Sequence, residues 1–307
     1  MDESIVVPKG VLMSDKELMG KFGILHPDLQ RALQRNVADA LSEDVGAGDL
    51  TGLLVPEVAQ VRAQVVVRES AVLCGVPWFE AVLKTVDSNI SVEWEYSEGD
   101  LMAANTVVCR LFGSARSLLT AERSALNFLQ LLSAVASSTR VYVDAIAGTK
   151  AAILDTRKTL PGMRLAQKYA VKVGGGENQR LALYDGILIK ENHIAAAGGI
   201  SAALKSASSV VEERAAVTVQ IEVESIDELN QALDAGAISI LLDNFELEMM
   251  RSAVEINKGR AKLEASGGVD LSTVRAIAET GIDRISIGAL TKDVKAIDFS
   301  MRVLDDL

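Results

Sequence analysis

At about 150 residues a domain, a chain of 307 residues has room for two domains or one large barrel. Its composition, 49% apolar and 24% charged, excludes a disordered protein, and its net charge of −11 argues against binding to nucleic acid or to an anionic membrane surface. The longest apolar runs, such as 238–242, are far shorter than the roughly 18 residues of a membrane helix, and the N-terminus lacks a basic signal-peptide head, so we expect a cytoplasmic protein.

The first half of the sequence predicts a mixed domain of strands and helices. Residues 1–26 form an irregular lead-in broken by glycine and proline, and a helical pattern then runs from Pro27 to about Leu41. Alternation of apolar and polar residues predicts strands at 61–68, 91–96 and 106–112. Pro77 opens a short helix between the first two of these strands.

A long helix is predicted at 116–138. Its apolar stripe consists of Leu118, Ala125, Leu129, Leu132 and Ala136. We therefore assign residues 27–148 to an N-terminal domain, which residues 293–307 are expected to join.

The second half alternates short apolar runs with single helices. The runs are 151–154, 186–189, 218–223, 238–242, 262–265 and 284–287. Ser225 and Glu228 have the spacing of a capping box at the start of one helix, and Gly236 follows its end. Six such units predict parallel strands in a barrel or a doubly wound sheet over residues 149–292, with the active site at the carboxyl ends of the strands.

Polar residues or glycines lie at the carboxyl ends of all six predicted strands or just after them. They are Asp155 to Lys158, Lys190 to His193, Glu222 and Glu224, Asp243 and Asn244, Ser266 to Gly268, and Gly288 and Ala289. Six such ends in series favour an active site at the mouth of a barrel over ordinary solvated loops.

The segment 157–190 is locally basic. It has seven Lys or Arg residues against two acidic ones. Three of the cations share helical spacing and are expected on a solvated helix face: Arg164, Lys168 and Lys172. Planar arginines and compact lysines together suit a ligand with several carboxylates and phosphates, and we assign that role to Arg157, Lys158, Arg180 and Lys190.

Glycine-rich loops supply candidate phosphate sites. The triple glycine 174–176 has neither the GK[ST] ending of a Walker loop nor the GxGxxG spacing of a dinucleotide site. Residues 266–268 and 286–290, on consecutive strands, resemble the paired loops by which barrels hold a phosphate through backbone N–H groups.

Two carboxylates complete the predicted mouth. Glu222 and Asp243 suit a Mg²⁺ that bridges to a pyrophosphate, and the alternative is that they are ion-pair partners of Lys158 and Lys190. His193 is equally compatible with a structural hydrogen bond. Only two cysteines are present, without a CxxC motif, so a disulfide framework or zinc site is not expected.

Nine motifs along the chain together resemble one enzyme family. They are EDVGAGDLT (43–51), TAERSALN (120–127), LDTRKTLPG (154–162), GGGENQR (174–180), LIKENH (188–193), EVE (222–224), LDNF (242–245), ASGG (265–268) and IGALT (287–291). Their order is that of the quinolinate phosphoribosyltransferases, also called carboxylating nicotinate-nucleotide pyrophosphorylases, and the similarity runs from about residue 27 to the C-terminus.

The resemblance implies a fold and a reaction. The fold is an N-terminal mixed α/β sandwich domain followed by an incomplete six-stranded parallel α/β barrel. The reaction transfers the phosphoribosyl group of 5-phosphoribosyl 1-pyrophosphate (PRPP) to quinolinate and releases pyrophosphate and CO₂, giving nicotinate mononucleotide in NAD biosynthesis. Mg²⁺ and a homodimer are also implied, each barrel mouth being covered by the neighbour's N-terminal domain.

The resemblance also implies roles for individual residues. The cations that bind the dicarboxylate and PRPP are Arg123 of the partner chain, Arg157, Lys158, Arg180 and Lys190, with Thr156 and Gln179 beside them. Lys158, Glu222 and Asp243 are the catalytic residues, and the two acids face the ribose and hold Mg²⁺ directly or through water or PRPP. The phosphate is cradled by Ser266, Gly267, Gly268, Gly288, Ala289 and Leu290.

One position departs from the family, which usually has histidine where this chain has Gln179. Two other functions stay open on the sequence. A sugar-phosphate aldolase or isomerase would use Lys190 or Lys158 as a Schiff-base amine. A non-catalytic paralogue, acting as an accessory protein in a transport operon, would have lost some of the five cations, all of which are present.

Overall fold

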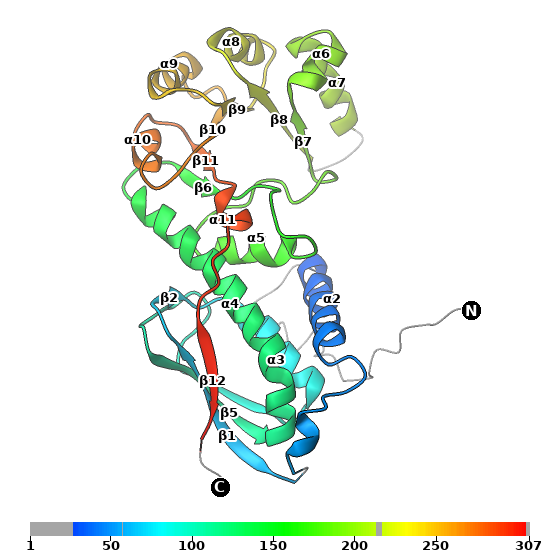
Figure 1. The fold of residues 1–307 in the computed structure, drawn as a ribbon. Coiled ribbons are helices and arrows are strands. Elements are labelled where there is room, and N and C mark those ends of the chain that lie inside the picture. Colours follow the sequence, from blue (N-terminus) through cyan, green and yellow to red (C-terminus); the bar gives the residue numbers. More distant parts are fainter. Residues whose placement is uncertain (1–26, 57, 213–216, 305–307) are drawn as a thin grey trace, which may run out of the picture. The chain divides into compact units, whose positions relative to one another are not determined.

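The computed structural model describes residues 27–56, 58–212 and 217–304 (Figure 1). The predicted lead-in, 1–26, lies outside the described residues. The described chain forms two compact units. The N-terminal unit contains the residues up to 137 with 161–174 and the segment from 294 onward, and the barrel unit contains 138–160 and 175–293.

These boundaries differ in two places from the predicted division after residue 148. Tyr142, near the end of the long helix, and Ile146, just after that helix, belong to the hydrophobic core of the barrel unit. Ala166, Ala170 and Val171 belong to the core of the N-terminal unit instead. The segment 161–174 therefore belongs to the N-terminal unit, although in sequence it interrupts the barrel unit.

A four-stranded antiparallel sheet forms one side of the N-terminal unit. The strand order is β12-β1-β5-β3. The strands are β1 (Gln60–Val67), β3 (Ser91–Trp94), β5 (Thr106–Ser114) and β12 (Phe299–Val303). Figure 1 shows β12, from the C-terminus, beside β1, where Val303 pairs with Ala63. A second sheet pairs β2 (Ala71–Val72) with β4 (Leu101–Met102).

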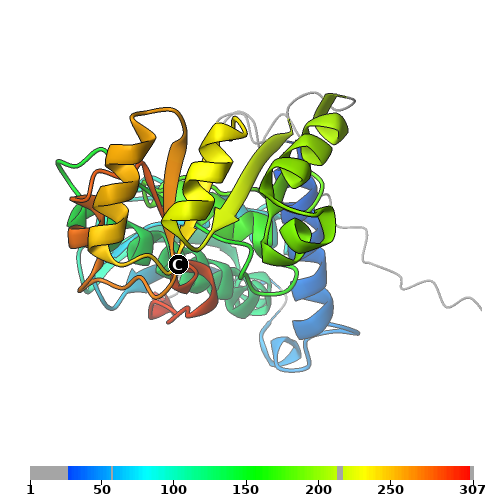
Figure 2. The same cartoon turned by 90° about the horizontal axis from the view of Figure 1, so that it is seen from above.

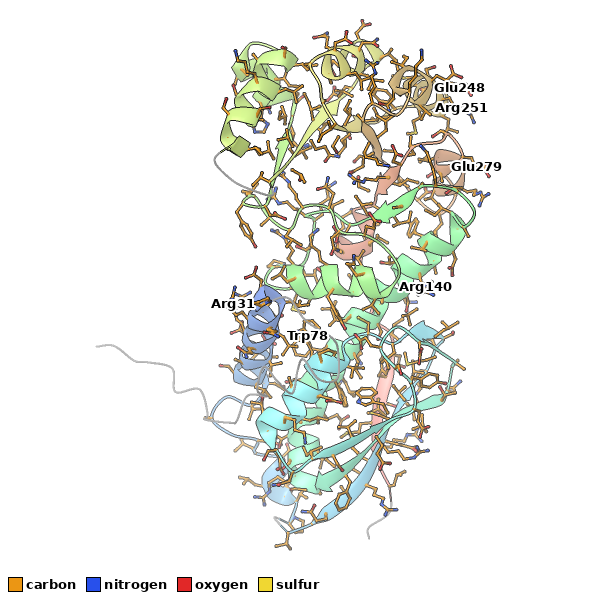
Figure 3. The ribbon with its side chains drawn as sticks, turned by 180° about the vertical axis from the view of Figure 1, so that it is seen from behind. Arg31, Trp78, Arg140, Glu248, Arg251 and Glu279 are labelled. Atoms are coloured by element: carbon orange, nitrogen blue, oxygen red, sulfur yellow. The ribbon has the colours of Figure 1, made fainter. Side chains whose placement is uncertain are left out.

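The helices of this unit share one hydrophobic core with the sheet. They are α2 (Pro27–Asp44), α3 (Val76–Val86), the first part of α4 (Ala115–Ala145) and α5 (Arg164–Val173), and a short 3₁₀ turn, η1, covers Gly52–Leu54. The predicted stripe on α4 is confirmed, because all five of its residues are buried. Trp78 of α3, labelled in Figure 3, is fully buried in the same core.

A carboxylate caps α3. The residue before the helix is Gly75, which has no side chain to accept from the first N–H groups, and Glu98 takes that role by accepting from Gly75 N at 2.9 Å and Val76 N at 3.0 Å. Burial raises the pKa of Glu98 and outweighs these two hydrogen bonds, which lower it.

One prediction for α5 is wrong. Lys168 was expected on a solvated face with Arg164 and Lys172, but only 1% of its surface is exposed. Helical spacing describes a shared face, and burial depends on what packs against it. Here α5 is covered on more than one side, since Gln167 is buried as well as the apolar residues.

Six parallel strands form the barrel unit, in the order β6-β11-β10-β9-β8-β7. The strands are β6 (Ala152–Leu154), β7 (Gly186–Ile189), β8 (Thr218–Val223), β9 (Ser239–Asp243), β10 (Lys262–Ser266) and β11 (Arg284–Ser286). All six predicted runs are strands. In the described chain β6 and β7 do not pair, so the predicted incomplete barrel is confirmed.

Helices cover the outside of the barrel (Figure 2). They are α6 (Glu191–Ala197), α7 (Ile200–Glu212), α8 (Ile226–Asp234), α9 (Leu247–Asn257) and α10 (Val274–Ala278), with the single turn α11 (Ala289–Lys292) after the last strand. No single helix of the described chain could span a membrane, although the bent pair α6 and α7 together has the required length and composition.

The predicted capping box of α8 is half formed. The Ser225 hydroxyl accepts from Glu228 N, as expected. The Glu228 carboxylate instead accepts from Glu224 N, one residue before the cap. Gly236 lies just past the helix with φ of 81°, the left-handed conformation that ends helices.

Candidate active site

The carboxyl ends of parallel strands share one edge of a sheet, so the polar residues that follow β6 to β11 lie at the same end of the barrel unit. This end is here called the barrel mouth. Of the residues predicted to bind substrate, all except Arg123 belong to the barrel unit.

An ion pair lies at the part of the mouth formed by β7 and β8. Lys190 follows β7, and its Nζ donates to Oε1 of Glu222 at 2.9 Å and to Oε2 at 2.6 Å. The Glu222 side chain is 10% exposed and that of Lys190 48% exposed, so the carboxylate is buried and the ammonium reaches solvent. The backbone N–H of Lys190 donates to Nδ1 of His193 at 3.0 Å, which gives that histidine a structural role.

Asp243, at the end of β9, belongs to the same electrostatic cluster. Burial and the negative charge of Glu222 raise its pKa, while Lys190 and Lys158 oppose that rise. Two carboxylates and two ammonium groups therefore interact electrostatically at the mouth. The sequence left open whether the two acids hold Mg²⁺ or form ion pairs with the lysines, and the same four side chains are suited to both roles.

Lys158 packs against Gly288, which lies just after the last strand, β11. A Cβ placed on Gly288 would lie 3.0 Å from Lys158 Cδ and 3.7 Å from Thr156 Oγ1, so a larger residue at 288 would push the lysine away. Two hydrogen bonds fix the backbone around it: Lys158 N donates to Thr156 Oγ1 at 3.0 Å, and Thr291 Oγ1 donates to Lys158 O at 2.8 Å. The loop after β6 and the loop after β11 are thus held together by this packing and by the hydrogen bond from Thr291 to Lys158.

The glycine loop after β10 packs against β9. Gly267 has φ of 101°, and a Cβ there would lie 2.1 Å from the side-chain oxygen of Asn244. Asn244 N donates to Ser266 O at 3.0 Å. Glycine is therefore required at 267 by both its backbone conformation and its closeness to Asn244, which keeps the backbone of 266–268 at the mouth.

The segment 177–180 lies beside β6. Glu177 forms a parallel bridge with Leu154. The buried Asp155 accepts from Asn178 Nδ2 at 2.6 Å and from Gln179 N at 3.0 Å. Asp155 thus holds the chain that carries Gln179 and Arg180.

Gln179 reaches into the barrel, where its amide group is engaged at both ends. Nε2 donates to Gln220 Oε1 at 2.6 Å and approaches Glu264 Oε1 at 3.3 Å, and Oε1 accepts from Arg180 N at 2.7 Å. Gln220 Nε2 donates to Glu264 Oε2 at 2.9 Å. Gln179, Gln220 and Glu264 are called the polar layer below.

Sequence reasoning missed Gln220 and Glu264. A signal was present, because each lies two residues before a predicted site residue of its own strand and therefore on the same inward face. Arg180, in contrast, was predicted, and its Nη1 donates to Gly186 O at the start of β7, 2.9 Å away. Burial and the nearby positive charge of Arg157 lower the pKa of Arg180.

Arg123 lies on α4, in the N-terminal unit, and its side chain is exposed. Within the described residues, no group of three or more His, Cys, Asp or Glu side chains could hold a metal ion. Glu222 and Asp243 are two carboxylates, which suits Mg²⁺ because that ion takes one or two protein carboxylates and completes its shell with water and substrate phosphates.

The chain matches the family models of both halves of one enzyme. Residues 49–133 match "Quinolinate phosphoribosyl transferase, N-terminal domain" and residues 135–302 match "Quinolinate phosphoribosyl transferase, C-terminal domain". Similar proteins include a chloroplastic nicotinate-nucleotide pyrophosphorylase (carboxylating) from Oryza sativa subsp. japonica, 36% identical over 98% of this chain and 85% of the rice protein. Quinolinate phosphoribosyltransferase (decarboxylating) 1 from Nicotiana glauca is 38% identical over 92% of this chain and 85% of its own length.

The fold is similar to solved structures as well. The nicotinate-nucleotide pyrophosphorylase from Francisella tularensis has a TM-score of 0.86 and 44% identity, and the comparison covers 92% of this chain and 99% of that one.

Proposed function

Because this chain belongs to the quinolinate phosphoribosyltransferase family, we propose that it transfers the phosphoribosyl group of PRPP to quinolinate, with loss of CO₂. The products are nicotinate mononucleotide, pyrophosphate and CO₂, and the reaction belongs to NAD biosynthesis. The observation that carries the assignment to this site is the cluster of Lys158, Lys190, Glu222 and Asp243 at the barrel mouth.

The chemistry needs such a cluster. When the bond from the ribose C1 to pyrophosphate breaks, negative charge grows on the leaving group and positive charge on the sugar. Lys158, beside Gly288, supports the first change through its ammonium group, and the carboxylates of Glu222 and Asp243 support the second. No strong protein nucleophile is required.

Each substrate has an expected place. The loops 266–268 and 288–290 offer backbone N–H groups to the 5-phosphate of PRPP. Arg157, Arg180 and Lys190 are the cations for the two carboxylates of quinolinate. Thr156 fixes the backbone of Lys158, and Gln179 orients Arg180 by accepting from its N–H.

Mg²⁺ is the expected metal, held by Glu222 and Asp243 directly or through water or PRPP. When bound, it neutralises charge on the departing pyrophosphate. The negative charge of the Glu222 carboxylate is also neutralised by the ammonium group of Lys190.

A homodimer is the expected assembly, with Arg123 of one subunit completing the site of the other. Two observations support it. Arg123 is exposed, and the segment around η1 presents apolar side chains to solvent, namely Leu50, Leu53, Leu54 and Val58.

The aldolase or isomerase alternative is less favoured by the geometry. A Schiff-base amine must give up its proton before it attacks a carbonyl, and Lys190 Nζ donates to both oxygens of Glu222.

The direct test is release of CO₂ from quinolinate labelled in the 2-carboxylate. We expect release only when PRPP and Mg²⁺ are both present, with nicotinate mononucleotide formed in equal amount. Nicotinate, which lacks that carboxylate, is the control and should release none. Failure of the folded protein to release CO₂ would contradict the proposed reaction, and trapping of a substrate adduct by borohydride would support the aldolase or isomerase.

A further inference from the structure

The hydrogen bonds of the polar layer all run in one direction. Arg180 N donates to Gln179 Oε1 at 2.7 Å, and Gln179 Nε2 donates to Gln220 Oε1 at 2.6 Å. Gln220 Nε2 then donates to Glu264 Oε2 at 2.9 Å. The series therefore starts at the backbone N–H of Arg180 and ends at the carboxylate of Glu264.

Glu264 sets this direction. An ionised carboxylate only accepts hydrogen bonds, whereas the amide of a glutamine can turn over and exchange its donor and acceptor ends. The amides of Gln220 and Gln179 consequently point their NH₂ groups along the series toward Glu264, which leaves Gln179 Oε1 for Arg180. Glu264 is 1% exposed and Gln220 7% exposed, so water competes little for the bonds between them.

The amide nitrogen of Gln179 is fully engaged inside the layer. Nε2 carries two N–H groups, and its acceptors are Gln220 Oε1 at 2.6 Å and the two oxygens of Glu264 at 3.3 and 3.5 Å. In this arrangement both N–H groups of Gln179 serve the described chain itself. Gln179 therefore acts on its surroundings through Oε1, and the group that Oε1 holds is Arg180.

Two contacts fix Arg180, one at each end of the residue. Its backbone N–H is held by Gln179 Oε1, and its Nη1 donates to Gly186 O at 2.9 Å. If the acceptor at the backbone end were lost, only the contact with Gly186 would remain from this pair. The orientation of the Gln179 amide thus bears directly on where the guanidinium group lies.

From these contacts, and resting on the proposed function, we propose that Glu264 is a positioning residue for quinolinate. It holds the amides of Gln220 and Gln179 in one orientation, and the oriented Gln179 keeps Arg180 where it binds a carboxylate of the substrate. Glu264 acts at two removes from quinolinate and has no part in binding PRPP.

Glu264→Gln is the direct test, because it keeps the shape of the side chain and adds N–H donors. Wherever the new NH₂ group points within the layer, it meets another amide NH₂ group, and the conflict is relieved only when Gln179 turns its NH₂ group toward Arg180 N. The KM for quinolinate should rise at least about fivefold and that for PRPP should change by less than about twofold. Steady-state release of CO₂ measures both constants.

Double variants separate positioning from a general loosening of the barrel. Gln179→Met removes the amide and should itself raise the KM for quinolinate. Adding Glu264→Gln should raise it no further, because the second change acts through the amide that the first has removed. Gln220→Met, which removes the middle amide, should raise the same KM and tests the series independently if Glu264→Gln does not fold.

Thr280→Val is the matched control. It removes a buried hydroxyl that donates to Ile277 O at 2.7 Å, in the same unit but outside the polar layer. Both KM values should stay at those of the original chain, and circular dichroism should show that every variant is folded.

Three results would overturn the inference while the original chain is active. They are an unchanged KM for quinolinate in folded Glu264→Gln or Gln220→Met, an equal rise in the KM for PRPP, and effects of Glu264→Gln and Gln179→Met that multiply in the double variant. An original chain that releases no CO₂ would contradict the proposed function itself, and the role of Glu264 would fall with it.

Discussion

Lys190 and Glu222 form a two-pronged contact in which one ammonium group donates to both carboxylate oxygens, at 2.9 and 2.6 Å. Each residue is also proposed to bind a different substrate component: Glu222 the metal and ribose, Lys190 a carboxylate of quinolinate. In the proposed complex, Glu222 contacts Mg²⁺ and the ribose while Lys190 contacts a carboxylate of quinolinate, so the ion pair between them is replaced by two separate contacts.

Glu222→Gln tests this exchange. Loss of the carboxylate should weaken binding of PRPP with Mg²⁺ by at least about tenfold, because removing a group that holds a metal or its shell has effects of about 10–100-fold. Quinolinate alone should bind more tightly, because Lys190 no longer has an internal partner. Calorimetry with each ligand measures both effects. Glu224→Gln, an exposed acid two residues later, is the control, and equal losses in the two variants would contradict the assignment.

Lys158→Ala should lower kcat/KM by at least about 100-fold, or roughly 2.7 kcal/mol of transition-state stabilisation. The reason is that Lys158, which packs against Gly288 at the barrel mouth, is the ammonium group proposed to stabilise the leaving pyrophosphate. Steady-state kinetics measure the loss, and Lys205→Ala, which removes an exposed lysine of α7, is the control. Near-normal activity of a folded Lys158→Ala protein would show that the site is wrongly placed.

Arg123→Ala and Lys158→Ala should each be inactive alone, yet activity should return in part when the two proteins exchange subunits. A hybrid dimer has one site that carries both original residues if Arg123 acts across the interface. The assay follows CO₂ release after mixing, and native mass spectrometry verifies that hybrids formed. Hybrids without activity would refute the arrangement.

Gln179→His should change kcat/KM by less than about tenfold, or 1.4 kcal/mol. The glutamine amide cannot carry a proton near neutral pH, and its Oε1 positions Arg180 through the backbone, so its role is orientation. Kinetics between about pH 5.5 and 7.5, roughly one unit on either side of the histidine pKa of about 6.5, measure the effect. A much larger gain in kcat/KM, with a new pH dependence, would show that the original chain lacks a catalytic group and would favour the alternative of a non-catalytic paralogue.

Glu98→Gln should change how stability depends on pH. Because burial raises the folded-state pKa of Glu98 above its unfolded value of about 4.3, the protonated form stabilises the fold. That contribution is fully present below the unfolded pKa and is lost as pH rises through the folded one. The stability of the original chain relative to the variant should therefore fall as pH rises.

Urea unfolding followed by tryptophan fluorescence measures this difference at several pH values. Glu93→Gln, at an exposed position of β3, is the control and should not alter the pH dependence. A difference that grows with pH would mean that Glu98 is stabilising as a carboxylate.

The strands and the mouth of the barrel were predictable from sequence because they depend on local patterns. Apolar runs of the right length predicted β7 and β8. Polar residues at the carboxyl ends of these strands pointed to Lys190, just after β7, and to Glu222, near the end of β8. The burial of Lys168 was not predictable, because it depends on α5 packing in the core of the N-terminal unit, whereas the residues on both sides of α5 in sequence belong to the barrel unit. The alternation of β8 and β10 indicated that Gln220 and Glu264 face inward, but their contact with Gln179 depends on the order of the strands, which places β8 and β10 on either side of β9.

The pairing of β12 with β1 places a constraint on synthesis. β1 emerges from the ribosome early, whereas its partner strand emerges only after the entire barrel has been translated. At roughly 5–20 residues a second, the edge of β1 waits for on the order of ten seconds or more with unpaired N–H and C=O groups. Such an edge is a template for strands of other chains, and nascent copies on one messenger RNA are close neighbours. Translation of β12 therefore ends a period in which the newly made chain is open to pairing with other copies of itself.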